Sequence, residues 1–239
     1  MIFVGIDFAF SYPYVDINDF FPDLNDCSPK TAKTLWAMID NINKDKDDLY
    51  GGGIWSDKIF REYYNSPIKR GKYFKSRRRL TELVARKYRA PSPTFNCVGP
   101  AGVGTGTLAG MRFINKIKNL LKTKCHIWPF DPYKNILSSK IVIAEIFPSL
   151  YFHYLGQNSM SKKGRERKLL SNTLKFYNHN FSSTLSLGNN DNDNDDMDAI
   201  VSCAALKYFV DKQAGFSHPF ASKEILKASR LEGWILGVN

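Results

Sequence analysis

Two short apolar runs in the chain each carry an acidic residue. Ile2 to Ile6 is followed at once by Asp7, and Ile141 to Phe147 (IVIAEIF) is apolar except for Glu145. Continuous apolar runs of this length are typical of strands buried on both faces. The pattern therefore predicts two buried strands with a carboxylate in, or at the end of, each.

Apolar residues recur at helical spacing in other segments. Ser28 and Pro29 have the residue types of a helix cap and first turn, and Leu35, Ile39 and Ile42 form an apolar stripe after them. Another apolar stripe runs from 108 to 121. A further helix follows a tract rich in Asn and Asp, and its inward-facing residues are predicted to be Met197, Ile200, Val201, Ala204 and Tyr208. A short helix is expected over 222 to 229. Strands separated by helices predict an α/β fold with a mainly parallel core.

The segments between these elements are charged, glycine-rich or of low complexity. They are predicted to be flexible loops near 43–56, 156–168 and 180–194. With 239 residues, 43% of them apolar, the chain can bury the core of one domain, which we expect to span 1–239.

The net charge narrows the choice of partner. The 34 basic and 23 acidic residues give a formal charge of +11. A surplus of this size favours a polyanion, nucleic acid before an acidic membrane.

The cysteines and histidines show no metal-binding or disulfide pattern. Cysteines 27, 97, 125 and 203 form no CxxC pair, and histidines 126, 153, 179 and 218 lie far apart. Such histidines are predicted to be packing or surface residues whose hydrogen bonds are satisfied. The N-terminus lacks the basic start of a signal peptide, and no run approaches the roughly 18 apolar residues of a membrane span. We therefore expect a cytoplasmic protein with reduced cysteines and no membrane partner.

Four carboxylates are the candidates for catalysis and metal binding. Asp195 and Asp198 lie three residues apart in the first turn of their predicted helix and point the same way, and each predicted strand carries one more acid, Asp7 or Glu145. Converging at the carboxyl edge of a sheet, the four would suit two Mg²⁺ or Mn²⁺ ions, which activate a water for phosphodiester hydrolysis. Each also has a structural interpretation, as a helix cap, a first-turn charge or one half of an ion pair.

Two better-known motifs are excluded. Asp191, Asp193 and Asp195 have the first spacings of an EF-hand, but Asp196 stands where glycine is needed and Ser202 where glutamate is. The segment GPAGVGTGTLAG lacks the Gly-Lys-Ser/Thr ending of a P-loop. It could still present backbone amides to a phosphate, or serve only for tight packing.

A basic segment supplies the candidate nucleic-acid contacts. From 69 to 89 there are ten basic residues, one acid (Glu82) and three interleaved aromatic residues. This composition suits contact with a phosphate backbone, or a solvated face without a partner. The candidates are Lys69, Arg70, Lys72, Lys75, Arg77, Arg78 and Arg79.

These motifs resemble a known family. VGIDFAFSYP, SPTFNCVGPAGVGTGTLAGMRF, IWPFD, VIAEIFPSL, DAIVSCAAL and EGWILGV occur in the order seen in domain-of-unknown-function family 429, predicted nucleases with the ribonuclease H fold. The resemblance runs from residue 2 to the C-terminus. It implies a ribonuclease H-like mixed sheet flanked by helices. By the same resemblance, Asp195 and Asp198 match the aspartate pair on the last helix of Holliday-junction resolvases of that fold. Glu145 matches the acid of the family's E-[IV]-[YF]-P strand, and Asp7 matches the acid of its ID-[FI]-P strand.

One departure concerns the N-terminal side. In the family an earlier GxD strand and a hairpin precede the ID motif, whereas this sequence starts at Met1. We therefore expect a sheet that lacks the first strands, because the chain is truncated or split or because Asp7 has taken over the missing role. An open edge would need cover from a second copy or another partner.

Three functions follow from these patterns. The first is a divalent-metal-dependent nuclease, in which Asp7, Glu145, Asp195 and Asp198 hold the metal. The alternatives are a nucleic-acid-binding module without catalysis and an enzyme that acts on a small phosphorylated molecule at the glycine-rich segment.

Overall fold

The chain forms an α/β structure around a small parallel sheet. A computed structural model describes residues 1–24, 27–136, 138–156, 166–180, 195–212 and 222–239. Strand β3 (Ile141–Glu145) lies between β1 (Ile2–Ile6) and β2 (Cys125–Ile127), and both pairings are parallel. The predicted α/β class is therefore confirmed. Within the described residues, however, the sheet is parallel throughout and not mixed as the resemblance implied.

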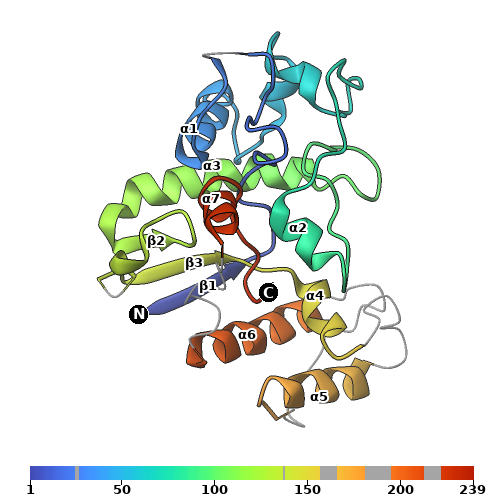
Figure 1. Cartoon of the computed structure of the whole chain (residues 1–239), viewed down its shortest axis with the longest axis vertical. Coiled ribbons are helices and arrows are strands. Elements are labelled where there is room, and N and C mark those ends of the chain that lie inside the picture. Colours follow the sequence, from blue (N-terminus) through green and yellow to red (C-terminus); the bar gives the residue numbers. More distant parts are fainter. Residues whose placement is uncertain (25–26, 137, 157–165, 181–194, 213–221) are drawn as a thin grey trace.

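Alternate residues of the strands enter two cores on opposite faces of the sheet. Val4, Ile6 and Ile143 pack in one core, whereas Phe3 and Val142 belong to the other. Figure 1 shows the matching layers: α3 (Gly104–Leu121) and then α1 (Ala32–Ile42) on one face, and α4 (Pro148–His153), α6 (Asp195–Asp211) and α5 (Glu166–Phe176) on the other. Coverage of both faces buries the central strand β3, as predicted. Edge strand β1 is only partly buried and Ile2 is exposed, so the burial predicted for this strand is wrong.

Helix boundaries follow local capping chemistry. Helix α1 begins after Thr31, whose hydroxyl accepts the Thr34 amide, so the start predicted at Ser28-Pro29 is three residues early. The predicted apolar stripe is confirmed at Leu35 and Ile39, which are fully buried. Helix α7 (Lys223–Glu232) is capped by Ser222 and extends beyond the predicted end at 229.

Helix α6 has most of its predicted inward face. Met197, Val201 and Ala204 are buried, whereas Ile200 and Tyr208 are only partly covered. Buried Phe209 and Ala205 complete this face. The small residues of this helix allow close contact with α4 and β1.

The segment 43–56 is more ordered than its composition suggested. It contains a 3-10 helix, η2 (Gly52–Trp55), in which Ile54 is fully buried. Gly51 lies against Leu108 of α3 at a distance that leaves no room for a side chain. Of the predicted loop 156–168, the last three residues belong to α5, and 157–165 lie outside the described residues, as do 181–194.

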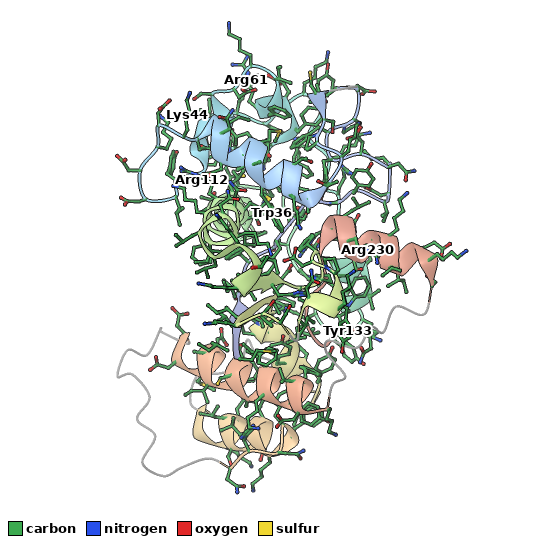
Figure 2. All side chains as sticks on the ribbon, turned by 90° about the vertical axis from the view of Figure 1, so that its left-hand side faces the viewer. Trp36, Lys44, Arg61, Arg112, Tyr133 and Arg230 are labelled. Carbon is green, nitrogen blue, oxygen red and sulfur yellow. The ribbon has the colours of Figure 1, made fainter. Side chains whose placement is uncertain are left out.

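Arg112 fixes the layer formed by α1 and α3 (Figure 2). This fully buried arginine donates from Nε to Asp40 (3.1 Å) and from its two terminal nitrogens to the carbonyls of Tyr50 and Lys46. One guanidinium thereby joins α3, α1 and the loop that follows α1.

The C-terminal segment closes the carboxyl end of the sheet. The Leu236 amide donates to the Glu145 carbonyl (2.9 Å), just beyond α7. Buried Glu232, at the end of α7, accepts the amides of Tyr14, Val15 and Leu80. Short helix α2 (Leu80–Ala85) packs on α7 at this point. Residues 14–15, the start of α2 and the end of α7 are thus held together near the carboxyl end of β3.

Among the described residues no helix combines the length and apolar character that crossing a bilayer requires.

The glycines of α3 offer a test of this packing. A Cβ at Gly110 would lie 2.2 Å from the ring of Phe8, whereas a Cβ at Gly106 would meet nothing within 4 Å. We expect Gly110→Ala to lower the free energy of unfolding by about 1–3 kcal/mol through overpacking. Gly106→Ala should raise it by up to about 1 kcal/mol, because alanine favours the helix. Urea unfolding of both variants measures this, and equal changes at the two sites would contradict the packing described.

Candidate active site at the carboxyl edge of the sheet

The two strand-borne acids lie next to each other. Ile6, the last residue of β1, pairs in register with Glu145, the last residue of β3. Asp7 follows Ile6 directly, so both carboxylates are at the carboxyl edge of the sheet, as predicted. In open parallel sheets this edge is the usual place for a ligand site.

Glu145 is held by a buried arginine. Arg79 donates through both terminal nitrogens to the two oxygens of Glu145, at 2.7 and 2.5 Å, and the Phe10 amide donates to Oε2 as well. The Glu145 and Arg79 side chains are only 3% and 2% exposed. With both oxygens engaged, Glu145 serves here as an ion-pair partner, and metal ligation by it would require Arg79 to release it.

Arg79 also neutralises a second buried acid. Its Nε donates to Glu82 Oε1 at 2.8 Å, and its backbone amide donates to the other oxygen of Glu82. Burial raises the pKa of Glu82, although Arg79 opposes this. Burial would lower the pKa of Arg79, but the charges of Glu145 and Glu82 outweigh it and raise that pKa, so the guanidinium stays charged.

Asp7, unlike the buried Glu145, is exposed to solvent. It lies between two hollows, both of which it lines. Surrounding protein, together with repulsion from Glu145 and Asp198, raises the pKa of Asp7 to about 7. Water reaches the exposed carboxylate and offsets part of the burial effect. An acid in this state exchanges a proton, or a cation, near neutral pH.

The first hollow, of about 530 Å³, holds the predicted aspartate pair. Asp195 and Asp198 of α6 line it together with Asp7, and residues 3–6 of β1 form its other wall. The close approach of α6 to β1 brings Asp198 near enough to repel Asp7. Three of the four predicted acids therefore share one hollow, whereas Glu145 lies in the other.

The donor set suits a hard cation only in part. Carboxylate oxygens are the ligands that Mg²⁺ and Mn²⁺ prefer. Yet no group of three or more acidic, histidine or cysteine side chains close enough to hold one ion occurs among the described residues. The predicted cluster of four carboxylates is therefore not assembled in the part of the chain that the structure describes. An ion held by one or two of these aspartates would complete its shell with water and phosphate, as Mg²⁺ commonly does.

The glycine-rich segment lines the second hollow, of about 440 Å³. Gly102 and Gly106, at the start of α3, face the same space as Asp7 and Arg79. Thr94 also lines this hollow, and its buried hydroxyl has no hydrogen-bond partner among the described residues. A helix N-terminus and an unpartnered hydroxyl suit a phosphate oxygen.

The predicted nucleic-acid contacts separate into two groups. Lys69, Arg70, Lys72 and Lys75 are exposed. Arg70 lies over the ring of Phe74 and Lys72 over that of Tyr73, at 5.0 and 5.2 Å from the ring centres. These residues keep a surface of cations and aromatic rings open to a partner.

The other three arginines are used within the protein. Arg79 is buried, so its assignment as a backbone contact is wrong. Arg77 donates to Asp16 and to three backbone carbonyls, with a side chain that is 8% exposed, and Arg78 donates to the Pro91 carbonyl. Their charges hold the long loops before α3 together.

Two features of the site were missed in the sequence. Arg79 was counted with its basic neighbours, although Glu82, the one acid of that run, stands three residues after it and signals an internal pair. Thr94 lies between two prolines and the glycine-rich segment, with nothing in its spacing to mark it.

Comparisons of the chain with models of known families, with curated proteins and with solved structures found no match. The resemblance to family 429 therefore stays a prediction that rests on the motifs alone.

The proton affinity of Asp7 is the first property to test. A folded Asp7 with a pKa of about 7 keeps its proton to a higher pH than an unfolded aspartate, whose pKa is about 3.9. The stability it contributes is complete below about pH 4 and is lost as the pH rises toward 7. Asp7→Asn should therefore gain stability relative to the wild type over this range. Carbon-13 NMR of the aspartate carboxyls measures the midpoint directly.

Neighbouring aspartates supply the controls. Asp198→Asn should lower the Asp7 midpoint, because it removes a repelling charge. Asp196→Asn, on the same turn but outside the hollow, should leave it nearly unchanged. A midpoint near 4 in the wild type would contradict the described surroundings of Asp7.

Proposed function

We propose that the protein is a divalent-metal-dependent nuclease that hydrolyses phosphodiester bonds of nucleic acid. The observation that carries this proposal is the position of Asp7, at the carboxyl edge of a parallel sheet and between two hollows. One hollow holds two further aspartates, and the other holds groups suited to phosphate. The finer proposal of a ribonuclease H-like fold rests on the resemblance of the motifs.

The aspartates of the first hollow are the residues that would hold Mg²⁺ or Mn²⁺. Asp7 and Asp198 repel each other, and a cation between them removes that cost. Asp195 would orient water or a second ion. When bound, the metal supplies an activated water and neutralises charge on the phosphate. We assign Glu145 to its ion pair with Arg79, which fixes the edge of the sheet beside Asp7.

The exposed loop 68–75 is the proposed contact for the nucleic-acid backbone. Its exposed cations Arg70, Lys72 and Lys75 suit phosphates, whereas exposed Lys69 is paired with Glu62 at 2.6 Å. Exposed Tyr73 offers a ring on which a base can stack. Neither phosphate contact nor stacking distinguishes one base from another, so we expect binding without strong preference for nucleotide sequence. The formal charge of +11 favours the same class of partner.

A second function is favoured by the hollow at the glycine-rich segment. At about 440 Å³ it can hold a small phosphorylated molecule, with its phosphate at Gly102, Gly106 and Thr94. In that case Asp7 would act on the bound small molecule, and the loop 68–75 would have no part.

Cleavage assays on single-stranded, duplex and branched DNA and RNA, with Mg²⁺, Mn²⁺ or chelator, test the proposal. Cleavage should require the metal. Asp198→Asn should lower its rate by about a hundredfold or more, since loss of a metal ligand costs several kcal/mol of transition-state stabilisation. Asp196→Asn is the matched control: it lies in the same first turn of α6 but outside the hollow, and it should cleave like the wild type.

Salt dependence distinguishes the alternatives. Binding to a polynucleotide should weaken steeply with salt, and Lys72→Gln together with Lys75→Gln should reduce the slope of log affinity against log salt by about 2. If the protein binds nucleic acid but cleaves it with neither Mg²⁺ nor Mn²⁺, the result would favour the nucleic-acid-binding module without catalysis. No polynucleotide binding at all would reject the nuclease and favour the small-molecule enzyme.

A further inference from the structure

A third hollow, of about 420 Å³, lies away from the acidic edge. It is lined by the end of α3, by residues at the amino ends of β2 and β3, and by Lys33 of α1. None of its lining residues belongs to the two hollows at Asp7. It is therefore independent of the proposed nuclease site.

The lining of this hollow carries a net positive charge, and Asp131 holds two of its lysines in place. Buried Asp131 accepts from Lys33 Nζ at 2.7 Å, from Lys118 Nζ at 2.5 Å and from the Ile127 amide at 2.9 Å. Burial would raise the pKa of Asp131, but these hydrogen bonds outweigh it and lower the pKa. With Lys122, three lysines face one aspartate, which leaves a surplus of two positive charges.

His126 gives the second, independent observation. It lines the hollow from β2, is 1% exposed, and neither of its ring nitrogens has a hydrogen-bond partner among the described residues. The scattered histidines were expected to be satisfied; His126 differs, as does Nε2 of His153, which is also buried without a partner among the described residues. Burial lowers the pKa of His126 to about 4, so at neutral pH the ring offers one donor and one acceptor. Buried polar groups of this kind are almost always paired.

We propose that this hollow binds a phosphate group, with Lys33, Lys118 and Lys122 supplying the positive charge and His126 hydrogen-bonding to its oxygens. A hydrogen phosphate dianion carries two negative charges, which match the surplus. It also has an O–H and bare oxygens, which match the acceptor and donor of a neutral imidazole. Chloride offers neither the second charge nor a donor.

The test uses the whole protein labelled with nitrogen-15 at its histidines. His126→Gln assigns the ring signals. Titration with sodium phosphate should then shift the His126 signals saturably, and sodium chloride at the same ionic strength should not. Lys122→Glu should weaken phosphate binding by about tenfold through reversal of one charge at the hollow. Lys116→Glu is the matched control, because Lys116, on α3, is exposed like Lys122 but lies outside the lining.

A second ligand distinguishes the source of the phosphate. A nucleoside 5′-monophosphate that binds more tightly than inorganic phosphate at His126 identifies the phosphate of a larger ligand, and weaker binding identifies free phosphate. The proposal is overturned if neither compound shifts His126, if chloride shifts it equally, or if Lys116→Glu weakens binding as much as Lys122→Glu. Because Lys122 and Lys116 are exposed, neither substitution should disturb the packing of the core.

Discussion

The buried pair of Arg79 and Glu145 is the interaction on which the acidic edge depends. One guanidinium faces Glu145 and Glu82, and its Nη1 also donates to the Glu232 carbonyl at the end of α7. Without that charge, two buried carboxylates would face each other with no counter-ion, a cost of several kcal/mol. The ion pair thus joins β3, α2 and α7, and it leaves Asp7 as the open acid of the edge.

This division of roles explains the chemistry proposed for the site. Glu145 is close enough to Asp7 to raise its pKa but is itself held by an arginine. Asp198 repels Asp7 from the other side, across the first hollow. A cation or a proton at Asp7 relieves both repulsions, so the protein favours a bound positive charge at the point where the two hollows meet.

The sequence predicted the parts of this arrangement that follow from local pattern. Both long strands, the inward face of α6 and the meeting of Asp7 with Asp198 could be expected, because apolar runs mark buried strands and carboxyl ends of parallel strands meet at one edge. Strand β2 was missed because Cys125–Ile127 is only three residues long. Glu82, three residues after Arg79, signals one internal pair, but the second partner, Glu145, is 66 residues away and no local pattern reveals it. His126 was missed for the same reason, since its lysine neighbours come from α1 and α3.

A double-mutant cycle between positions 79 and 145 tests the central claim most directly. Urea unfolding at pH 7 would compare the wild type, Arg79→Met, Glu145→Gln and the double variant, with exposed Arg86→Met as a control for the loss of one arginine. Each single variant should lose several kcal/mol, and the coupling energy should be about 2 kcal/mol or more. A coupling energy near zero, or an Arg79→Met no less stable than Arg86→Met, would contradict the claim that this ion pair holds the acidic edge together.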